Sequence, residues 1–156
     1  MWKTKRDLVI HTLSNIFLIL AYGGIKIFRY DLVDNEITDA RFPIKAHAPV
    51  SRTIELVEFD HDPGSEEVPA EFARRGLERP TYEDAFTFGI EHPEEQRRRP
   101  VAFLDEPVLV GGGRRVLVLS GSDRARRIDR RYWFAGGWNR SCGFAAVRKA
   151  ARNAAA

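Results

Sequence analysis

The segment VAFLDEPVLVGGGRRVLVL, residues 101–119, contains three short apolar runs rich in valine and leucine. Runs of this length and composition, bounded by turn residues, are typical of buried strands. The three glycines at 111–113 join the second run to the third, and glycine tolerates the positive φ angles of a tight turn. The segment therefore predicts a β-hairpin. A further turn at residues 120–123 (SGSD) and a strand at residues 128–134 are expected after it.

The sequence before this segment predicts another strand and two short helices. Residues 52–59 (RTIELVEF) alternate imperfectly between apolar and polar side chains, as a half-buried strand does. Pro69 and Gly76 bracket a short helix, because proline suits its first turn and glycine the position after its end. Thr81 and Asp84 have the spacing of a capping box, which predicts the start of a second helix.

The uncharged stretch at residues 8–25 has more than one interpretation. Its 18 residues without Asp, Glu, Lys or Arg are long enough for a transmembrane helix, and the basic residues before it would keep the N-terminus inside. Alternatively, residues 5–14 form an amphipathic helix, and residues 16–22 (IFLILAY) pair as a strand with residues 25–32 (IKIFRYDL).

Two observations favour the helix and hairpin. Gly23-Gly24 and Asp34-Asn35 are turn signals at strand spacing. The first half of the stretch also contains polar residues that a spanning helix tolerates poorly: His11, Thr12, Ser14 and Asn15. A cleaved signal peptide is a third interpretation, although the sequence matches a cleavage site poorly. We expect a cytoplasmic protein, with a single-pass membrane protein whose N-terminus is inside as the alternative.

The C-terminal residues 144–156 (FAAVRKAARNAAA) have high helix propensity and predict a terminal helix. Together the elements predict an α+β fold: a mostly antiparallel sheet with an N-terminal helix, short connecting helices and a C-terminal helix. A chain of 156 residues corresponds to a single domain, residues 1–156. The charged, proline-bounded residues 92–100 (HPEEQRRRP) are the candidate subdomain boundary.

The net charge of +3 conceals an uneven distribution along the chain. Residues 1–96 carry 11 basic and 18 acidic side chains, whereas residues 97–156 carry 14 basic and 4 acidic ones, and all but one of these basic residues are arginines. Arginine binds phosphate through a planar fork of donors, and interleaved aromatic rings can stack on bases. The candidate polyanion-binding residues are Arg124, Arg126, Arg127, Arg130, Arg131, Trp133 and Trp138.

The same charge distribution has other interpretations. Arginines can form a solvated face, and the basic part of the chain can pair with the acidic part within one molecule. Our first hypothesis is a non-enzymatic binding module whose C-terminal half contacts a polyanion, with nucleic acid as the leading candidate. The alternative is an interaction subunit of a larger protein assembly, either a homo-oligomer or a complex with another protein, with residues 8–25 as its membrane anchor.

Few residues stand in an arrangement that is typical of a catalytic site. An enzyme is therefore our third hypothesis, and we expect no catalytic residue. The one cysteine excludes an internal disulfide and a cysteine-based zinc cluster. As a nucleophile, Cys142 would depend on the N-terminus of the helix expected from residue 144. The acidic patch around Asp60, His61 and Asp62 contains the oxygen ligands that a hard cation prefers, but it lacks the spacing of a calcium loop.

Metal ions and cofactors are likewise not expected. The four histidines, His11, His47, His61 and His92, show no short-range pair of the kind that zinc ligands form. Glycines 111–113 precede two arginines and so suggest an anion-binding loop, but the phosphate-loop and dinucleotide-binding spacings are absent. A plain hairpin turn is therefore the favoured interpretation of these glycines.

Overall fold

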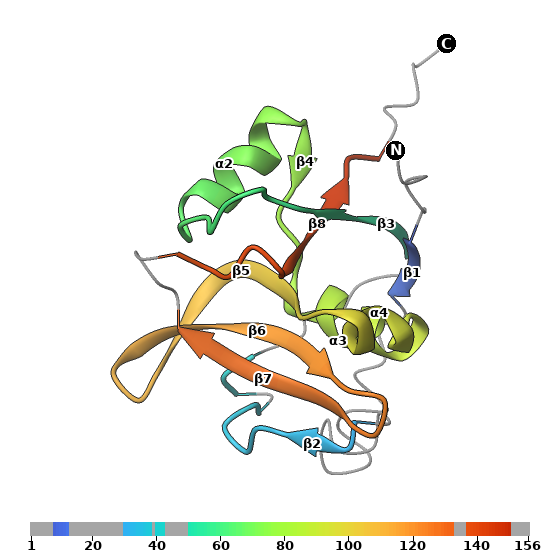
Figure 1. Ribbon diagram of the computed structural model, residues 1–156, viewed down its shortest axis with the longest axis vertical. Helices are drawn as coiled ribbons and strands as arrows, with labels where there is room; N and C mark the ends of the chain where they lie inside the picture. Colours follow the sequence, from blue (N-terminus) through green and yellow to red (C-terminus); the bar gives the residue numbers. More distant parts are fainter. Residues whose placement is uncertain (1–7, 13–29, 39, 43–49, 133–136, 151–156) are drawn as a thin grey trace.

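The computed structural model describes residues 8–12, 30–38, 40–42, 50–132 and 137–150, which contain eight strands and three short helices (Figure 1). The strands are β1 (Leu8–Thr12), β2 (Leu32–Val33), β3 (Val50–Val57), β4 (Leu77–Glu78), β5 (Val101–Val110), β6 (Gly113–Gly121), β7 (Arg126–Tyr132) and β8 (Gly143–Arg148). The helices are α2 (Glu67–Arg74), α3 (Tyr82–Glu91) and α4 (Pro93–Arg98). All strands belong to one curled sheet in the order β1-β3-β8-β5-β6-β7-β2, and β4 pairs with β8.

The middle of the sheet is buried on both faces. In β5, Val101 and Phe103 join one apolar cluster, whereas Ala102 and Leu104 join a second one. Successive side chains of a strand point to opposite faces, so a strand buried on both faces has a continuous apolar run. β6 and β8 divide their side chains between the two clusters in the same way.

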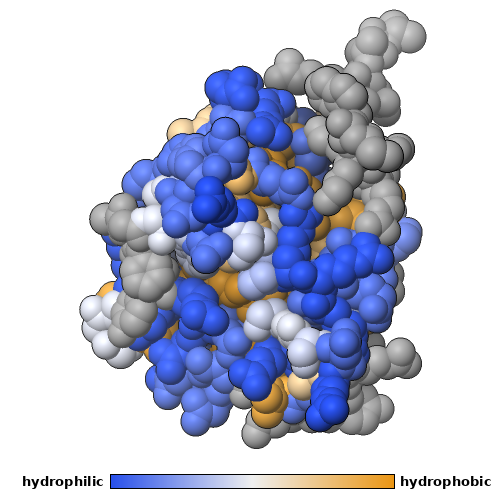
Figure 2. All heavy atoms as spheres, viewed as in Figure 1, coloured by the Kyte–Doolittle hydropathy of each residue, from blue (hydrophilic) through white to orange (hydrophobic). Residues whose placement is uncertain are grey.

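Each cluster has its own helical cover. The α3-side cluster includes Phe86 and Phe88 of α3, and the α2-side cluster includes Val68 and Phe72 of α2. In Figure 1, β8 and β5 run between these two helices. Trp138, from the loop before β8, also belongs to the α2-side cluster. Figure 2 shows hydrophilic residues over most of the face viewed, with small hydrophobic areas between them.

The expected α+β fold with terminal helices is wrong, because the described chain is mostly β. Leu8–Thr12 forms β1 within the segment predicted as the N-terminal helix, and it pairs antiparallel with β3. The predicted C-terminal helix begins instead with strand β8. The sheet is also mixed, since β5 runs parallel to β8 and β2 runs parallel to β7.

Burial on both faces explains why residues 143–148 form a strand rather than the start of the predicted helix. Phe144 and Ala146 point into the α2-side cluster, and Ala145 and Val147 point into the α3-side cluster. A short apolar run that is buried on both faces has no period that separates a strand from a helix. The high helix propensity of alanine is a weak local preference, which these contacts override.

Several local predictions are confirmed. Gly111 and Gly112 have positive φ angles of 57° and 77° and form the two-residue turn between Val110 and Gly113, so the glycine run is a hairpin turn. Thr81 and Asp84 form the predicted capping box at the start of α3. Gly76, with a φ of 69°, follows α2, although this helix begins two residues before Pro69.

The predicted connector at residues 92–100 contains helix α4, and its Gln96 is fully buried. The Gln96 amide donates hydrogen bonds to the carbonyl oxygens of Ser120 and Arg127, at 2.8 and 3.0 Å. The predicted strand at residues 16–22 and the Gly23-Gly24 turn lie outside the described residues. None of the helices in the described ranges is long and apolar enough to cross a membrane.

Candidate polyanion-binding surface

Strand β7 carries arginines on both of its faces. Ile128 belongs to the α3-side cluster, so Arg126 and Arg130, each two residues away, face the same side. Arg127 and Arg131 face the opposite side. The predicted binding residues in this strand are therefore divided into two pairs with different surroundings.

Arg126 is a buried structural residue, with an exposed fraction of 5%. Its guanidinium lies over the ring of Tyr30, 4.9 Å from the centroid, and its Nη2 donates a hydrogen bond of 2.6 Å to the carbonyl oxygen of Gly89. Gly89 leaves room for the Tyr30 ring, because a Cβ at this position would lie 1.8 Å from the tyrosine oxygen. Burial raises the pKa of Tyr30, so the ring stays neutral beneath the arginine.

Arg130 and Trp138 also have partners within the fold. Arg130 forms an ion pair with Asp34, with an Nε to Oδ2 distance of 2.9 Å. Trp138 is 6% exposed, and its indole Nε1 donates a hydrogen bond of 2.8 Å to the hydroxyl of Ser65. The indole ring packs edge-on against Phe144. Trp133 lies outside the described residues.

On the other face of β7 the arginines are exposed. Arg131 pairs in register with Val116 of β6, and Arg127 pairs with Ser120. Arg114 lies two residues before Val116, so its side chain shares this face. Arg114, Arg127 and Arg131 are all exposed. We call these three residues the open arginine face; Arg124, which is also exposed, lies in the turn that leads into β7.

The three arginines of the open face form no salt bridge with any described residue, unlike most arginines around them. Arg99 pairs with Glu58, and Arg148 pairs with Glu55. Pairing of the basic part of the chain with the acidic part, one of the interpretations of the sequence, thus holds for these residues and for Arg130. Arg114, Arg127 and Arg131 have no such ion-pair partner among the described residues.

Asp129 lies between Arg127 and Arg131 on the same face of β7. Its carboxylate accepts a hydrogen bond of 3.3 Å from the Ser120 hydroxyl and is only partly exposed.

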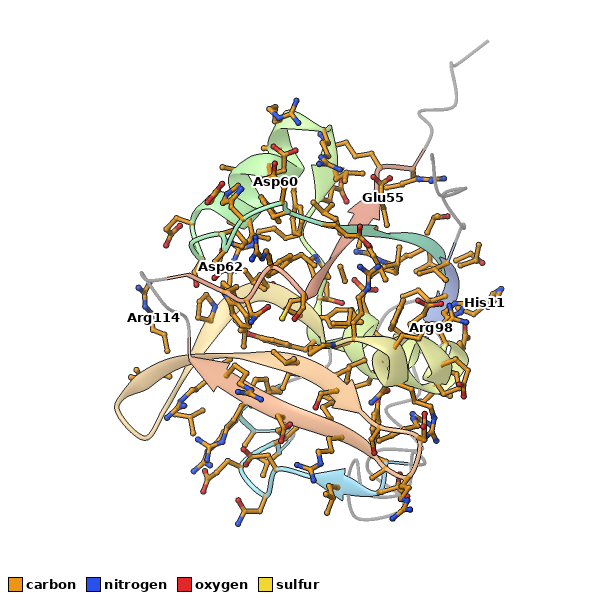
Figure 3. All side chains as sticks on the ribbon, viewed as in Figure 1. His11, Glu55, Asp60, Asp62, Arg98 and Arg114 are labelled. Atoms are coloured by element: carbon orange, nitrogen blue, oxygen red, sulfur yellow. The ribbon has the colours of Figure 1, made fainter. Side chains whose placement is uncertain are left out.

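Figure 3 shows Arg114 near the β5–β6 hairpin, on the opposite side of the view from His11 on β1. From the sequence, Arg114 was named only as one of the two arginines that follow the glycine turn, and it was not among the predicted binding residues. The signal that places it beside Arg131 is the two-residue alternation along β6, combined with the hairpin register.

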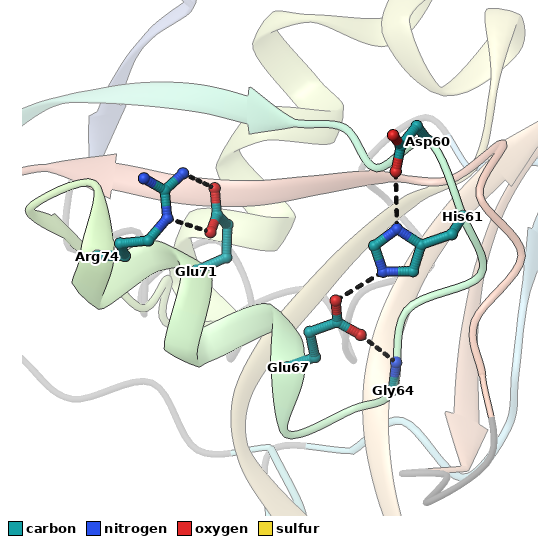
Figure 4. Close-up of polar contacts among 6 residues, drawn as sticks. All are labelled: Asp60, His61, Gly64, Glu67, Glu71 and Arg74. Carbon is teal, nitrogen blue, oxygen red and sulfur yellow. Dashed lines mark hydrogen bonds and ion pairs between the residues drawn. The ribbon is translucent and has the colours of Figure 1, made fainter.

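The acidic patch around His61 is held together by hydrogen bonds (Figure 4). His61 Nδ1 lies 2.8 Å from Asp60 Oδ1, and Nε2 lies 2.6 Å from Glu67 Oε1. The hydrogen bonds to Asp60 and Glu67 raise the pKa of His61, since both carboxylates favour the imidazolium. Nearby, the Arg74 and Arg75 guanidiniums lower the pKa of Glu71 to about 2. Among the described residues, no three acidic, histidine or cysteine side chains are arranged to hold a metal ion.

Cys142 is a packed side chain of the α2-side cluster, 7% exposed. Burial raises the pKa of its thiol, although the charges of Arg131 and Arg99 oppose this shift. A reactive cysteine needs a lowered pKa. The helix N-terminus that the sequence suggested as its activator is absent, because residues 143–148 form a strand.

Comparison with known proteins gave no match: no protein-family model, no curated protein and no solved structure matches the chain.

Proposed function

We propose that this protein is a non-enzymatic polyanion-binding module, with nucleic acid as the leading ligand, and that the open arginine face contacts the phosphates. The observation that supports this proposal is that Arg114, Arg127 and Arg131 lie on one face of the β6–β7 hairpin, are each exposed and have no ion-pair partner among the described residues. A cytoplasmic location, which gives access to nucleic acid, is part of the same proposal.

The spacing of the arginines suits an extended ligand. Arg127 and Arg131 are four residues apart on one strand, which corresponds to about 13 Å between their backbone positions. Each guanidinium can form two parallel hydrogen bonds with one phosphate. The face therefore offers contacts with separate phosphates along a chain, rather than a single site for one small anion. Arg124, in the turn before β7, is a further exposed arginine three residues before Arg127.

The structural roles of Arg126, Arg130 and Trp138 place them outside the proposed contact set. Arg126 and Trp138 are buried, and Arg130 is paired with Asp34. Phosphate contacts made by exposed arginines position a nucleic acid without reading its bases. We therefore expect binding with little sequence preference and with a strong dependence on salt.

The test is fluorescence anisotropy with a labelled single-stranded oligonucleotide, and with a heparin fragment as a polyanion without bases. We expect Arg114→Ala, Arg127→Ala and Arg131→Ala together to weaken binding about tenfold or more, since three phosphate contacts are lost. A matched control removes three exposed or half-exposed arginines elsewhere on the chain: Arg74→Ala, Arg75→Ala and Arg98→Ala.

The control has the same net charge as the open-face variant, so it separates a local site from general attraction. An equal loss of affinity in both variants would mean that net charge alone, and not this face, determines binding. A wild-type chain that binds neither probe would refute the proposal. Binding of heparin alone would exclude nucleic acid as the ligand. Asp129→Asn supplies an opposite change, because removal of a negative charge between Arg127 and Arg131 should tighten binding.

A further inference from the structure

Among the described strands, β1 is one edge of the sheet, and its sequence is suited to pairing with another strand. It reads LVIHT, with two β-branched apolar residues, no formal charge and no proline. Exposed edges of this kind promote association between chains, and proteins usually block them with charges, proline, bulges or a covering element. At the opposite end of the strand order, β2 is only two residues long and offers little to pair with.

Two side chains from the end of α3 occupy the outer edge of β1. The ring Nε2 of His92 lies 2.7 Å from the carbonyl oxygen of Val9, to which it can only donate. The backbone N–H of His11 donates to both carboxylate oxygens of Glu91, each at 3.2 Å. Val9 and His11 are two residues apart, so their backbone groups point to the same side of the strand.

These contacts match what a neighbouring strand would supply. An added strand would offer an N–H to the Val9 carbonyl and a C=O to the His11 N–H. His92 supplies the donor and Glu91 supplies the acceptor, in the correct order along β1. We propose that Glu91 and His92 form an edge lock, which prevents β1 from pairing with the β1 strand of a second copy of this chain.

Further contacts position Glu91 and His92 beside β1. The backbone N–H of His92 donates a hydrogen bond of 2.8 Å to the carbonyl of Phe88, and its ring packs against the Phe88 ring at 5.3 Å between centroids. Glu91 is also in contact with the His11 ring, where Oε2 lies 3.3 Å from Nδ1. The apolar residues beside the edge, Val9 and Ile90, are each 36% exposed, so they would add buried area to a strand pair if the lock were removed.

The experiment compares the mass of the full chain by sedimentation velocity over a wide range of concentration. We expect Glu91→Ala with His92→Ala to self-associate about tenfold more tightly than wild type, because two backbone groups of β1 are left without partners. Glu91→Gln with His92→Gln keeps an acceptor and a donor at the same positions and should behave as wild type.

A further variant tests whether the chains associate through β1. Val9→Lys, added to the double alanine variant, places a charge on the edge strand and should restore the wild-type mass. Should the double alanine variant fail to fold, Glu91→Ala alone still frees the His11 N–H, and its association at high concentration decides the question. An alanine variant that folds and keeps the wild-type mass would overturn the edge lock, as would association that Val9→Lys does not reverse.

Discussion

Strands β5 and β7 differ in what covers their two faces. In β5, the neighbours Phe103 and Leu104 point to opposite faces, and both are fully buried. In β7, the neighbours Arg126 and Arg127 also point to opposite faces, but only Arg126 is buried. The cover on the α3 side therefore extends across both strands, whereas the cover on the α2 side ends before β7. The open arginine face lies where this cover is missing.

The largest effects are expected in the doubly covered strand. Phe103→Ala and Leu104→Ala should each lower the free energy of unfolding by about 3–4 kcal/mol, because each deletes a fully buried side chain and leaves a cavity. Leu109→Ala, in the same strand, should change it by less than about 0.5 kcal/mol, since Leu109 is 73% exposed. Urea unfolding measures all three. A small loss for either Phe103 or Leu104 would mean that this face of β5 is not packed as described.

The two faces of β7 should differ in the same way. Arg126→Met should cost about 2–3 kcal/mol of unfolding free energy, because the hydrogen bond to Gly89 and the contact with Tyr30 are lost. Arg127→Met should cost less than about 0.5 kcal/mol, since it changes an exposed side chain. The same unfolding experiment tests this pair. Equal costs at the two positions would remove the distinction between a structural and an open face.

A smaller, pH-dependent effect is expected at His61, in the loop before α2. Its pKa is raised in the folded state by hydrogen bonds to Asp60 and Glu67. A raised folded pKa contributes stability that is fully present below the unfolded pKa of about 6.5 and is lost as the pH rises through the folded value. The difference in stability between wild type and His61→Gln should therefore shrink from mildly acidic to alkaline pH. A difference that does not change with pH would contradict the observed contacts.

The local turn and cap signals in the sequence were sufficient to predict parts of the fold. Gly111 and Gly112 adopt the positive φ angles that their turn requires, and Thr81 and Asp84 form the expected cap. These signals depend on residues close together in the chain. The strand conformation of β8 has no such local signal. It depends on burial between strands that are far away in the sequence and pair with β8 on both sides.

The residues of the proposed binding surface could be selected from the sequence only in part, for the same reason. The arginine content of residues 97–156 gave rise to the polyanion hypothesis, but every arginine in RRIDRRY has the same local signal. Whether a given side chain meets Tyr30 and Gly89, pairs with Asp34 or stays exposed depends on strand pairing and on which helix covers each face. The alternation along β7 divides the arginines, and the sequence alone does not show which half is covered.

The most direct test of the central claim is the salt dependence of oligonucleotide binding by the wild type and the open-face variant. For a single strand, the slope of log affinity against log salt concentration changes by about 0.7 for each phosphate contact. Replacement of Arg114, Arg127 and Arg131 with alanine should therefore flatten the slope by about 2, whereas the Arg74, Arg75 and Arg98 control keeps the wild-type slope. An unchanged slope in the open-face variant would contradict the assignment of this face as the phosphate-binding surface.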